Sequence, residues 1–127
     1  MANLAESLRI IHKHQGSLGA AVVDINTGTC LAIIGGRTLD MPALSAFYAS
    51  FLSNKEKIVS DMGQKSVIEE VIVTSSDQYH ILYPLKIQIL RSRKPESIFF
   101  FVVLTKAAAT LAQNRATMKE IVATFAL

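Results

Sequence analysis

Several kinds of residue are scarce in this chain of 127 residues, and each scarcity excludes a class of structure. The single cysteine, Cys30, cannot form a disulfide within the chain, which favours a reducing compartment. The longest apolar runs, "LGAAVV" and "SIFFFVVL", are far shorter than the roughly 20 residues that span a bilayer. The segment "MANLAESLRIIHKH" lacks the basic start and apolar centre of a signal peptide. We therefore expect a cytoplasmic protein without a membrane span.

Charge is also scarce, and this bears on the partners of the protein. Charged residues make up 18% of the chain, and the formal net charge is +3. So small an excess does not predict nucleic-acid binding. The nearest basic cluster is Lys86, Arg91, Arg93 and Lys94, which lacks the interleaved aromatic residues of a single-strand binder. We interpret it as a solvated loop and expect no nucleic-acid partner.

The residue types that hold metals and cofactors are not grouped in the sequence. No cluster of His, Cys, Asp and Glu has the spacing of metal ligands. His12 and His14 are two apart on a predicted helix, so they do not face each other. The "GGRT" segment at residues 35–38 lacks the GK[ST] ending of a phosphate loop. The sequence therefore predicts no metal, no cofactor and no GTPase activity of its own.

Apolar residues are abundant, at 50% of the chain, and they fall into segments with a clear period. Helical spacing predicts helices over residues 2–14, 41–62 and 108–126. Runs rich in β-branched residues predict strands over residues 18–25, 29–36, 66–75, 78–85 and 97–105. Asp40 is expected to cap the middle helix, and Gly28 and the Ser76-Asp77 pair are expected to form hairpin turns.

The order of these segments is α-β-β-α-β-β-β-α, in a length that suits one domain, residues 1–127. The run "IFFFVVL" is apolar at every position, so both faces of that strand must be covered. We therefore predict an α+β fold. It consists of a five-stranded antiparallel sheet with two helices on one face and the long middle helix on the other.

Three stretches carry a pattern beyond their secondary structure. They are "GSLGAAVVDINTGTCLA", "EEVIVTSSDQYHILYPL" and "FFFVVLTKAAATLAQNR". The first resembles the first hairpin of the roadblock family, which is named after a type of dynein light chain. The second is similar to a hairpin of its small bacterial single-domain members, and the third to its last strand and helix. The order of segments matches that family along nearly the whole chain.

The resemblance implies an assembly and a function. Roadblock proteins pair through their middle helices and third strands, and they act as non-catalytic platforms for small Ras-like GTPases or signalling complexes. We therefore expect a bacterial, non-enzymatic homodimer that binds, scaffolds or regulates such a GTPase or complex. The expected interface residues are Leu44, Phe47, Tyr48, Phe51, Lys55, Ile68, Glu70, Ile72 and Thr74. The wide apolar stripe of the middle helix and an unpaired Val- and Ile-rich edge strand favour the same interface.

Two other functions are alternatives. One is a small-molecule-sensing regulatory domain that uses the sheet as PAS- and GAF-like domains do. The other is an enzyme that uses Cys30, or His80 with its neighbours Asp77 and Tyr79. Neighbours in a strand point to opposite faces, so Tyr79 and His80 cannot form a dyad. Cys30 lies in an apolar run without a base beside it. We therefore expect no catalytic residues.

Overall fold

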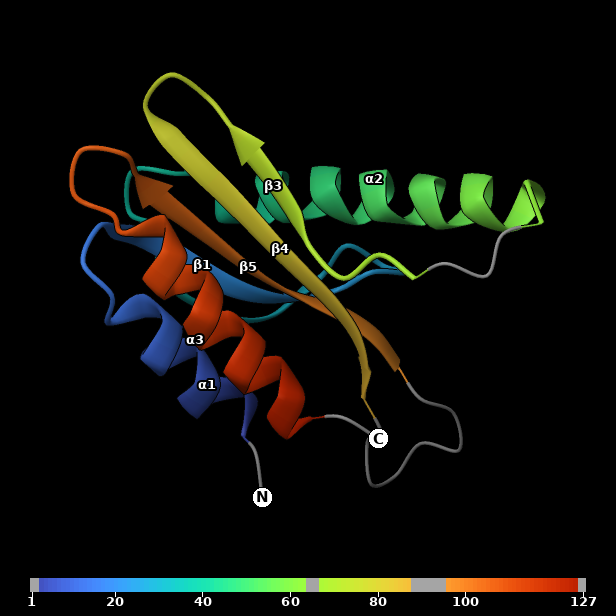
Figure 1. Cartoon of the computed structure of the whole chain (residues 1–127), viewed down its shortest axis with the longest axis horizontal. Coiled ribbons are helices and arrows are strands. Elements are labelled where there is room, and N and C mark those ends of the chain that lie inside the picture. The colour runs from blue at the N-terminus through green and yellow to red at the C-terminus, as the bar shows by residue number, and fades with distance from the viewer. Residues whose placement is uncertain (1–2, 64–66, 88–95, 126–127) are drawn as a thin grey trace.

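The computed structural model describes residues 3–63, 67–87 and 96–125 (Figure 1). Within them the chain forms three helices and five strands in the predicted order. Their bounds are α1 Leu4–His12, β1 Ser17–Asp24, β2 Cys30–Gly35, α2 Met41–Asp61, β3 Val71–Thr74, β4 Gln78–Ile87, β5 Glu96–Thr105 and α3 Leu111–Thr124. Three residues of the expected basic loop, Arg91, Arg93 and Lys94, lie outside the described residues.

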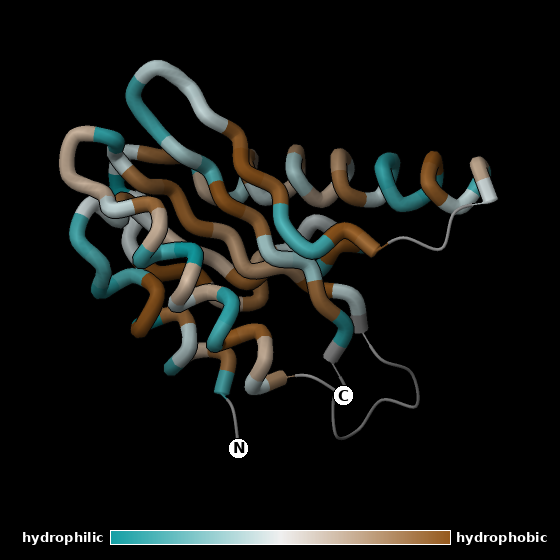
Figure 2. The backbone as a smooth tube through the Cα atoms, viewed as in Figure 1, coloured by the Kyte–Doolittle hydropathy of each residue, from teal (hydrophilic) through white to brown (hydrophobic). Residues whose placement is uncertain are grey.

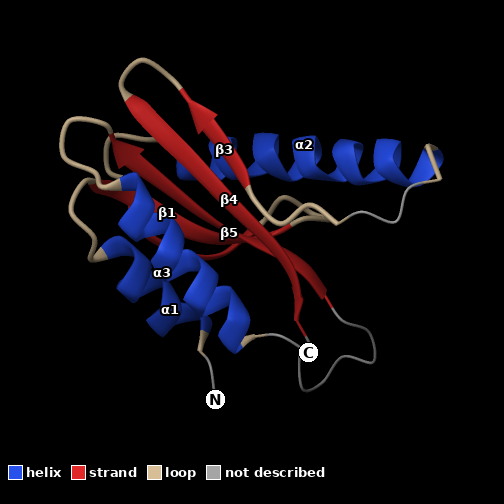
Figure 3. Ribbon diagram, viewed as in Figure 1, coloured by secondary structure: helices blue, strands red, loops and turns tan. Residues whose placement is uncertain are grey.

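One five-stranded sheet forms the middle layer of the molecule. Its strand order is β2-β1-β5-β4-β3, and every pairing is antiparallel. Helices α1 and α3 cover one face, and α2 covers the other (Figures 1 and 3). The predicted α+β fold and the predicted placement of the helices are confirmed. The sheet has two edge strands, β2 and β3.

The central strand β5 contributes to the core on both of its faces. Phe100 and Val102 pack on the side of α1 and α3, whereas Phe99 and Phe101 pack on the side of α2. Every residue from 98 to 104 is buried. Figure 2 shows the apolar residues running along the middle of the sheet. The run "IFFFVVL" is therefore covered from both sides, as its composition requires.

Two short turns connect the hairpins as predicted. Gly28 adopts φ +74° between β1 and β2, and its amide donates to the Asp24 carbonyl at 2.8 Å. A positive φ of this kind favours glycine. Between β3 and β4 the Ser75 amide donates to the Gln78 carbonyl at 3.0 Å, which makes the two intervening residues the centre of the turn.

Asp40 caps α2 as expected, because its Oδ1 accepts a hydrogen bond from the Ala43 amide at 3.0 Å. The prediction was less accurate at the other helix ends. α1 spans only Leu4–His12, and α3 begins at Leu111 and not near residue 108. The amide of Ala109 donates instead to the Thr105 carbonyl at 3.0 Å, in a turn that leads the chain out of β5.

Strand β3 is shorter than the predicted segment of residues 66–75, because it pairs with β4 only over Val71–Thr74. If the register continued, residue 69 would lie opposite Pro84. Opposite residues in an antiparallel ladder alternate between hydrogen-bonded and non-hydrogen-bonded pairs. Ser75 and Gln78 form a bonded pair, so counting along the two strands makes the pair of residues 69 and 84 a bonded pair too. Proline has no N–H to donate, so the ladder ends before Pro84.

Candidate functional site

Helix α2 carries a row of apolar side chains on its outward side. Phe47, Phe51, Ile58 and Met62 are 65%, 36%, 53% and 66% exposed. With the half-buried Leu44 they form what we name the α2 stripe. The steps from Leu44 to Phe47, Phe51 and Ile58 are three, four and seven residues, as in a coiled-coil seam, and Met62 follows one turn after Ile58. Figure 1 shows the C-terminal half of α2 extending past the sheet, so much of the stripe is available to a partner.

The other side of α2 packs on the sheet. Met41 and Leu52 are buried there, and Tyr48 is only 6% exposed. The Tyr48 ring meets Phe101 edge-on, with ring centroids 5.2 Å apart. Tyr48, which the sequence placed in the expected interface, therefore lies in the core beneath α2. Lys55, also expected there, is exposed.

The free edge of β3 is a second surface that can take a partner. Because Val71 and Val73 pair inward with β4, the backbone groups of Ile72 and Thr74 point away from the sheet. Thr74 is exposed, and Val73 is 39% exposed. The side chain of Ile72 packs toward the cluster beneath α1 and α3, so this residue offers its backbone at the edge and its side chain to the core.

The residues just before β3 have contacts within the chain. Ile68 packs against the cluster beneath α2. The Glu70 carboxylate accepts two hydrogen bonds from Arg115 of α3, at 2.7 Å and 3.0 Å. These bonds and the negative charge raise the pKa of Arg115 above its ordinary value. Glu70, another expected interface residue, is thus already paired with a residue of its own chain.

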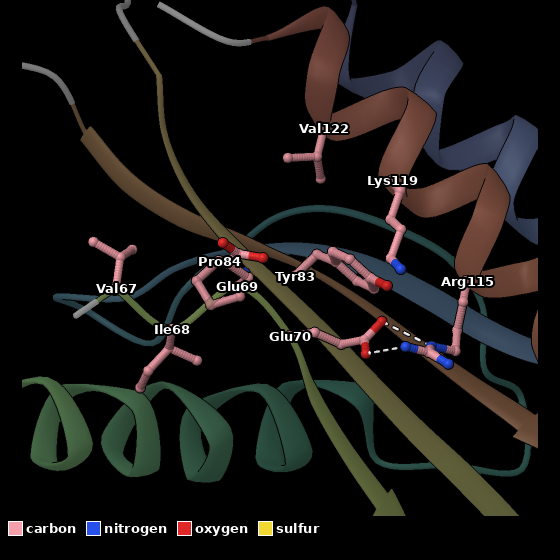
Figure 4. A pocket seen from close by; sticks show the side chains of 9 residues that line it. All are labelled: Val67, Ile68, Glu69, Glu70, Tyr83, Pro84, Arg115, Lys119 and Val122. Carbon is pink, nitrogen blue, oxygen red and sulfur yellow. Dashed lines mark hydrogen bonds and ion pairs between the residues drawn. The ribbon is translucent and has the colours of Figure 1, made fainter.

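A cavity of about 550 Å³ lies beside this ion pair, between the segment before β3, strand β4 and helix α3 (Figure 4). Glu70, Arg115 and Lys119 line it with Tyr83, whose hydroxyl is buried. Sequence reasoning did not identify this cavity. The residues come from three separate segments, and the alternation of β4 indicated only that Tyr83 lies on the opposite face of the sheet from His80.

His80, the first catalytic candidate, lies beneath α2. Its Nδ1 is 2.6 Å from the Tyr48 hydroxyl, and its Nε2 is 3.0 Å from Oε1 of Gln78. The Gln78 oxygen can only accept, so Nε2 carries the proton and Nδ1 accepts from Tyr48. Burial lowers the pKa of His80, and the charge of Asp77 opposes that shift. Both ring nitrogens of a neutral histidine are therefore satisfied.

The remaining residues of the proposed catalytic set are not brought together. Tyr79 packs on the opposite face of the sheet from His80. The Lys106 ammonium lies over its ring, 5.2 Å from the ring centroid. The half-buried Cys30 donates its thiol hydrogen to the Ser45 hydroxyl at 3.2 Å. Among residues 3–63, 67–87 and 96–125, no three His, Cys, Asp or Glu side chains form a possible metal site. None of the helices in those ranges has the length and apolar character needed to cross a membrane.

Comparisons with known proteins bear on this fold. No family model matches the sequence, and no curated protein matches it. The gliding protein MglB from Thermus thermophilus superposes with a TM-score of 0.72 at 14% identity, over 93% of this chain and 82% of that one. An MglB with a tetrameric arrangement superposes with a TM-score of 0.71 at 13% sequence identity, over 96% of this chain and 84% of that one. The Roadblock/LC7 domain from Streptomyces avermitilis superposes with a TM-score of 0.70 at 10% sequence identity, over 98% of this chain and 94% of that one. The protein has the roadblock fold.

At such low identities the likeness establishes the fold alone. The roadblock fold expected from the sequence is confirmed, including the position of the long helix on one face and the third strand at an edge. Within this roadblock fold, three of the nine expected interface residues lie on the α2 stripe and two on the β3 edge. The arrangement offers surfaces for association. His80 and Cys30 are already hydrogen-bonded within the chain.

Proposed function

We propose that the protein is a bacterial cytoplasmic homodimer that binds, scaffolds or regulates a small Ras-like GTPase or a signalling complex and has no enzymatic activity of its own. The observation that carries this proposal is the α2 stripe. A monomer that exposes Phe47, Ile58 and Met62 along one helix leaves several large apolar side chains in water. Burying that surface is favourable, at about 25 cal/mol per Å² of apolar area.

The occupant that we propose for the α2 stripe is the same stripe of a second copy. Heptad spacing suits a partner helix with the same period, and a twofold axis brings the same surface of both copies together. Strand β3 lies near α2, since Val71 packs against the same cluster as Tyr48 and Leu52 on the inward side of that helix. A twofold axis that joins two α2 helices can therefore also join two β3 edges into one continuous sheet.

The proposed GTPase partner is supported by the resemblance to the roadblock family and by the structural likeness to MglB. The absence of an enzymatic role is proposed on the state of His80, which is neutral and bonded at both nitrogens, and on the bonded thiol of Cys30. The alternative use of the sheet in the manner of PAS- and GAF-like domains is not favoured. Helices cover both faces of this sheet, and the solved structures compared above are MglB proteins and a Roadblock/LC7 domain.

The homodimer is tested by light scattering over a dilution series of the purified protein. We expect twice the mass of one chain at micromolar concentration, with dissociation only on strong dilution. Salt up to about 0.5 M is expected to leave the dimer intact, because apolar contacts are not screened as surface charges are. A monomer throughout the series would contradict the homodimer.

The GTPase partner is tested by capture from the native cell on immobilised protein, in parallel with GDP and with a slowly hydrolysed GTP analogue. We expect a small GTPase whose retention depends on the nucleotide. The recovered GTPase is then purified, and its GTP hydrolysis is measured with and without this protein. Capture of no GTPase in either nucleotide state would contradict this part of the proposal and leave the homodimer standing.

A further inference from the structure

The cavity beside Glu70 has a polar end at Glu70, Arg115 and Lys119, and an opposite end that is mainly apolar but includes Glu69 (Figure 4). At the apolar end Ile68 and Val67 approach from the segment before β3, and Pro84 from β4. Val122 of α3 adds a further apolar side chain. At about 550 Å³ the cavity falls within the range of roughly 300–1,000 Å³ that holds small ligands. Its shape therefore suits a molecule with an apolar body and one polar group.

The Tyr83 hydroxyl is the unusual group at the polar end. Tyr83 is 3% exposed, and its hydroxyl has no hydrogen-bond partner within the described part of the chain. Leaving a buried hydroxyl unpaired is unfavourable, so such groups nearly always have a partner. In Figure 4 this hydroxyl points toward the end of the cavity where Lys119 and Arg115 lie. An acceptor bound there would satisfy it.

The charges at the polar end indicate which acceptor fits. The Glu70 carboxylate is paired with Arg115 through two hydrogen bonds, whereas the Lys119 ammonium forms no ion pair with a described residue. Glu69, the other acidic residue of the lining, lies beside Pro84 (Figure 4). One ammonium without an ion-pair partner and one hydroxyl donor match a monoanion with oxygen acceptors, and a carboxylate has that chemistry.

We propose that this cavity binds a small monocarboxylate with an apolar body. The carboxylate accepts hydrogen bonds from the Tyr83 hydroxyl and the Lys119 ammonium, and the body packs on Ile68, Pro84 and Val122. The Glu70–Arg115 pair fixes the wall behind the carboxylate. The proposal does not depend on the homodimer or on a GTPase. It also differs from PAS- and GAF-like use of a sheet, because the cavity lies at the side of the sheet, under α3.

Titration with hexanoate and octanoate, followed by amide chemical shifts, tests the proposal on the full chain. We expect saturable binding of one molecule per chain, with the largest shifts at Ile68, Glu70 and Tyr83. Hexanol tests whether the charge is needed, and hexyl phosphate tests whether a phosphate is taken instead. We expect hexanol to bind at least about tenfold more weakly than hexanoate, since a hydrogen bond to a charged group is worth about 1.4 kcal/mol or more. Hexyl phosphate is expected to bind more weakly as well, because its second negative charge finds no further unpaired cation among the lining residues.

Two variants and two matched controls identify the site. Tyr83→Phe removes only the unpaired hydroxyl, so we expect the thermal midpoint to be unchanged or slightly higher and hexanoate affinity to fall about tenfold. Lys119→Met is expected to weaken binding by a similar factor. The same changes outside the cavity, Tyr79→Phe and Lys106→Met, are expected to leave affinity unchanged. No saturable binding of either acid, equal binding of hexanol, or wild-type affinity in Tyr83→Phe would overturn the proposal.

Discussion

His80 is held by two neighbours of opposite hydrogen-bonding character. Tyr48 donates to its Nδ1 across the gap between β4 and α2, and Gln78 accepts from its Nε2. A second proton would have to go to Nδ1, where the Tyr48 hydroxyl already donates, so the hydroxyl would need another acceptor. The contact therefore favours the neutral ring, and it links the sheet to the helix that carries the α2 stripe.

This arrangement predicts a pH dependence of stability. Burial lowers the pKa of His80 in the folded chain below the value of about 6.5 of a free histidine. The unfolded chain consequently binds a proton more readily. The stabilisation is present above pH 6.5 and is lost as the pH falls from there through the lower pKa of the folded state. We expect the thermal midpoint to decrease between pH 7.5 and pH 5, and to decrease less in His80→Gln.

The matched comparison for this prediction is His14→Gln. His14 also contacts a hydroxyl, that of Thr117 at 2.7 Å, but it joins the segment after α1 to α3, which lies on the opposite face of the sheet from α2. Differential scanning fluorimetry over the pH range compares the three proteins. A pH dependence that persists unchanged in His80→Gln, or disappears in His14→Gln alone, would show that His80 is not the group responsible.

At the scale of elements, the start of α2 is the best-defined local signal in the chain. Asp40 caps that helix with its carboxylate, whereas Thr110 stands at the same position of α3 without a side-chain hydrogen bond. Asp40→Ala is expected to lower the free energy of unfolding by about 1 kcal/mol. Thr110→Ala is the control, and it is expected to change stability by less than about 0.5 kcal/mol. Urea unfolding of both variants measures the difference, and equal losses would contradict the assignment of the cap.

The elements that sequence predicted most accurately are those set by local chemistry. Gly28 and the Ser76-Asp77 turn determined two hairpins, and alternation along β4 placed Tyr79 and His80 on opposite faces, as observed. The length of β3 was not predicted, because it depends on which residue of β4 lies opposite. Pro84 ends the ladder because the register places it opposite residue 69. That register depends on how the two strands pack in the folded chain, and the sequence of β3 alone does not specify it.

The side-chain direction of Ile72 is a second element-scale property that matters for experiments. A charged substitution at Ile72 looks like a selective test of edge pairing when only the sequence is considered. The side chain packs toward the core beneath α1 and α3, so Ile72→Lys would destabilise the monomer itself. The α2 stripe is the better place for charged substitutions, because Phe47 and Ile58 are exposed.

At the scale of the whole molecule, the order and apolar character of the segments predicted the fold, because a strand that is apolar at every position needs helices on both sides. The contacts that define the candidate sites were not predictable. Tyr48 and His80 are 32 residues apart, and Glu70 and Arg115 are 45 apart. No local period relates such pairs. They become neighbours only when α2 and α3 take their places on the sheet.

The proposed twofold interface includes both α2 and β3. We therefore expect substitutions on α2 that separate the two chains to expose the β3 edge as well. Phe47→Glu with Ile58→Glu places charge on both halves of the α2 stripe, and we expect a folded monomer by light scattering. The control is Ser50→Glu with Ser60→Glu, which adds the same number of charges at exposed positions of α2 outside the stripe. We expect the control to remain a dimer.

Hydrogen exchange then shows whether β3 belongs to the same interface. The amides of Ile72 and Thr74 point away from β4 and have no acceptor among the described residues, so pairing with a second β3 would protect them in the proposed dimer. We expect both amides to be protected in the wild type and in the control, and to exchange rapidly in the monomeric variant. The amides of Val71 and Val73 bond to β4 and are expected to stay protected in all three proteins. Equal exchange of Ile72 and Thr74 in monomer and dimer would restrict the interface to α2.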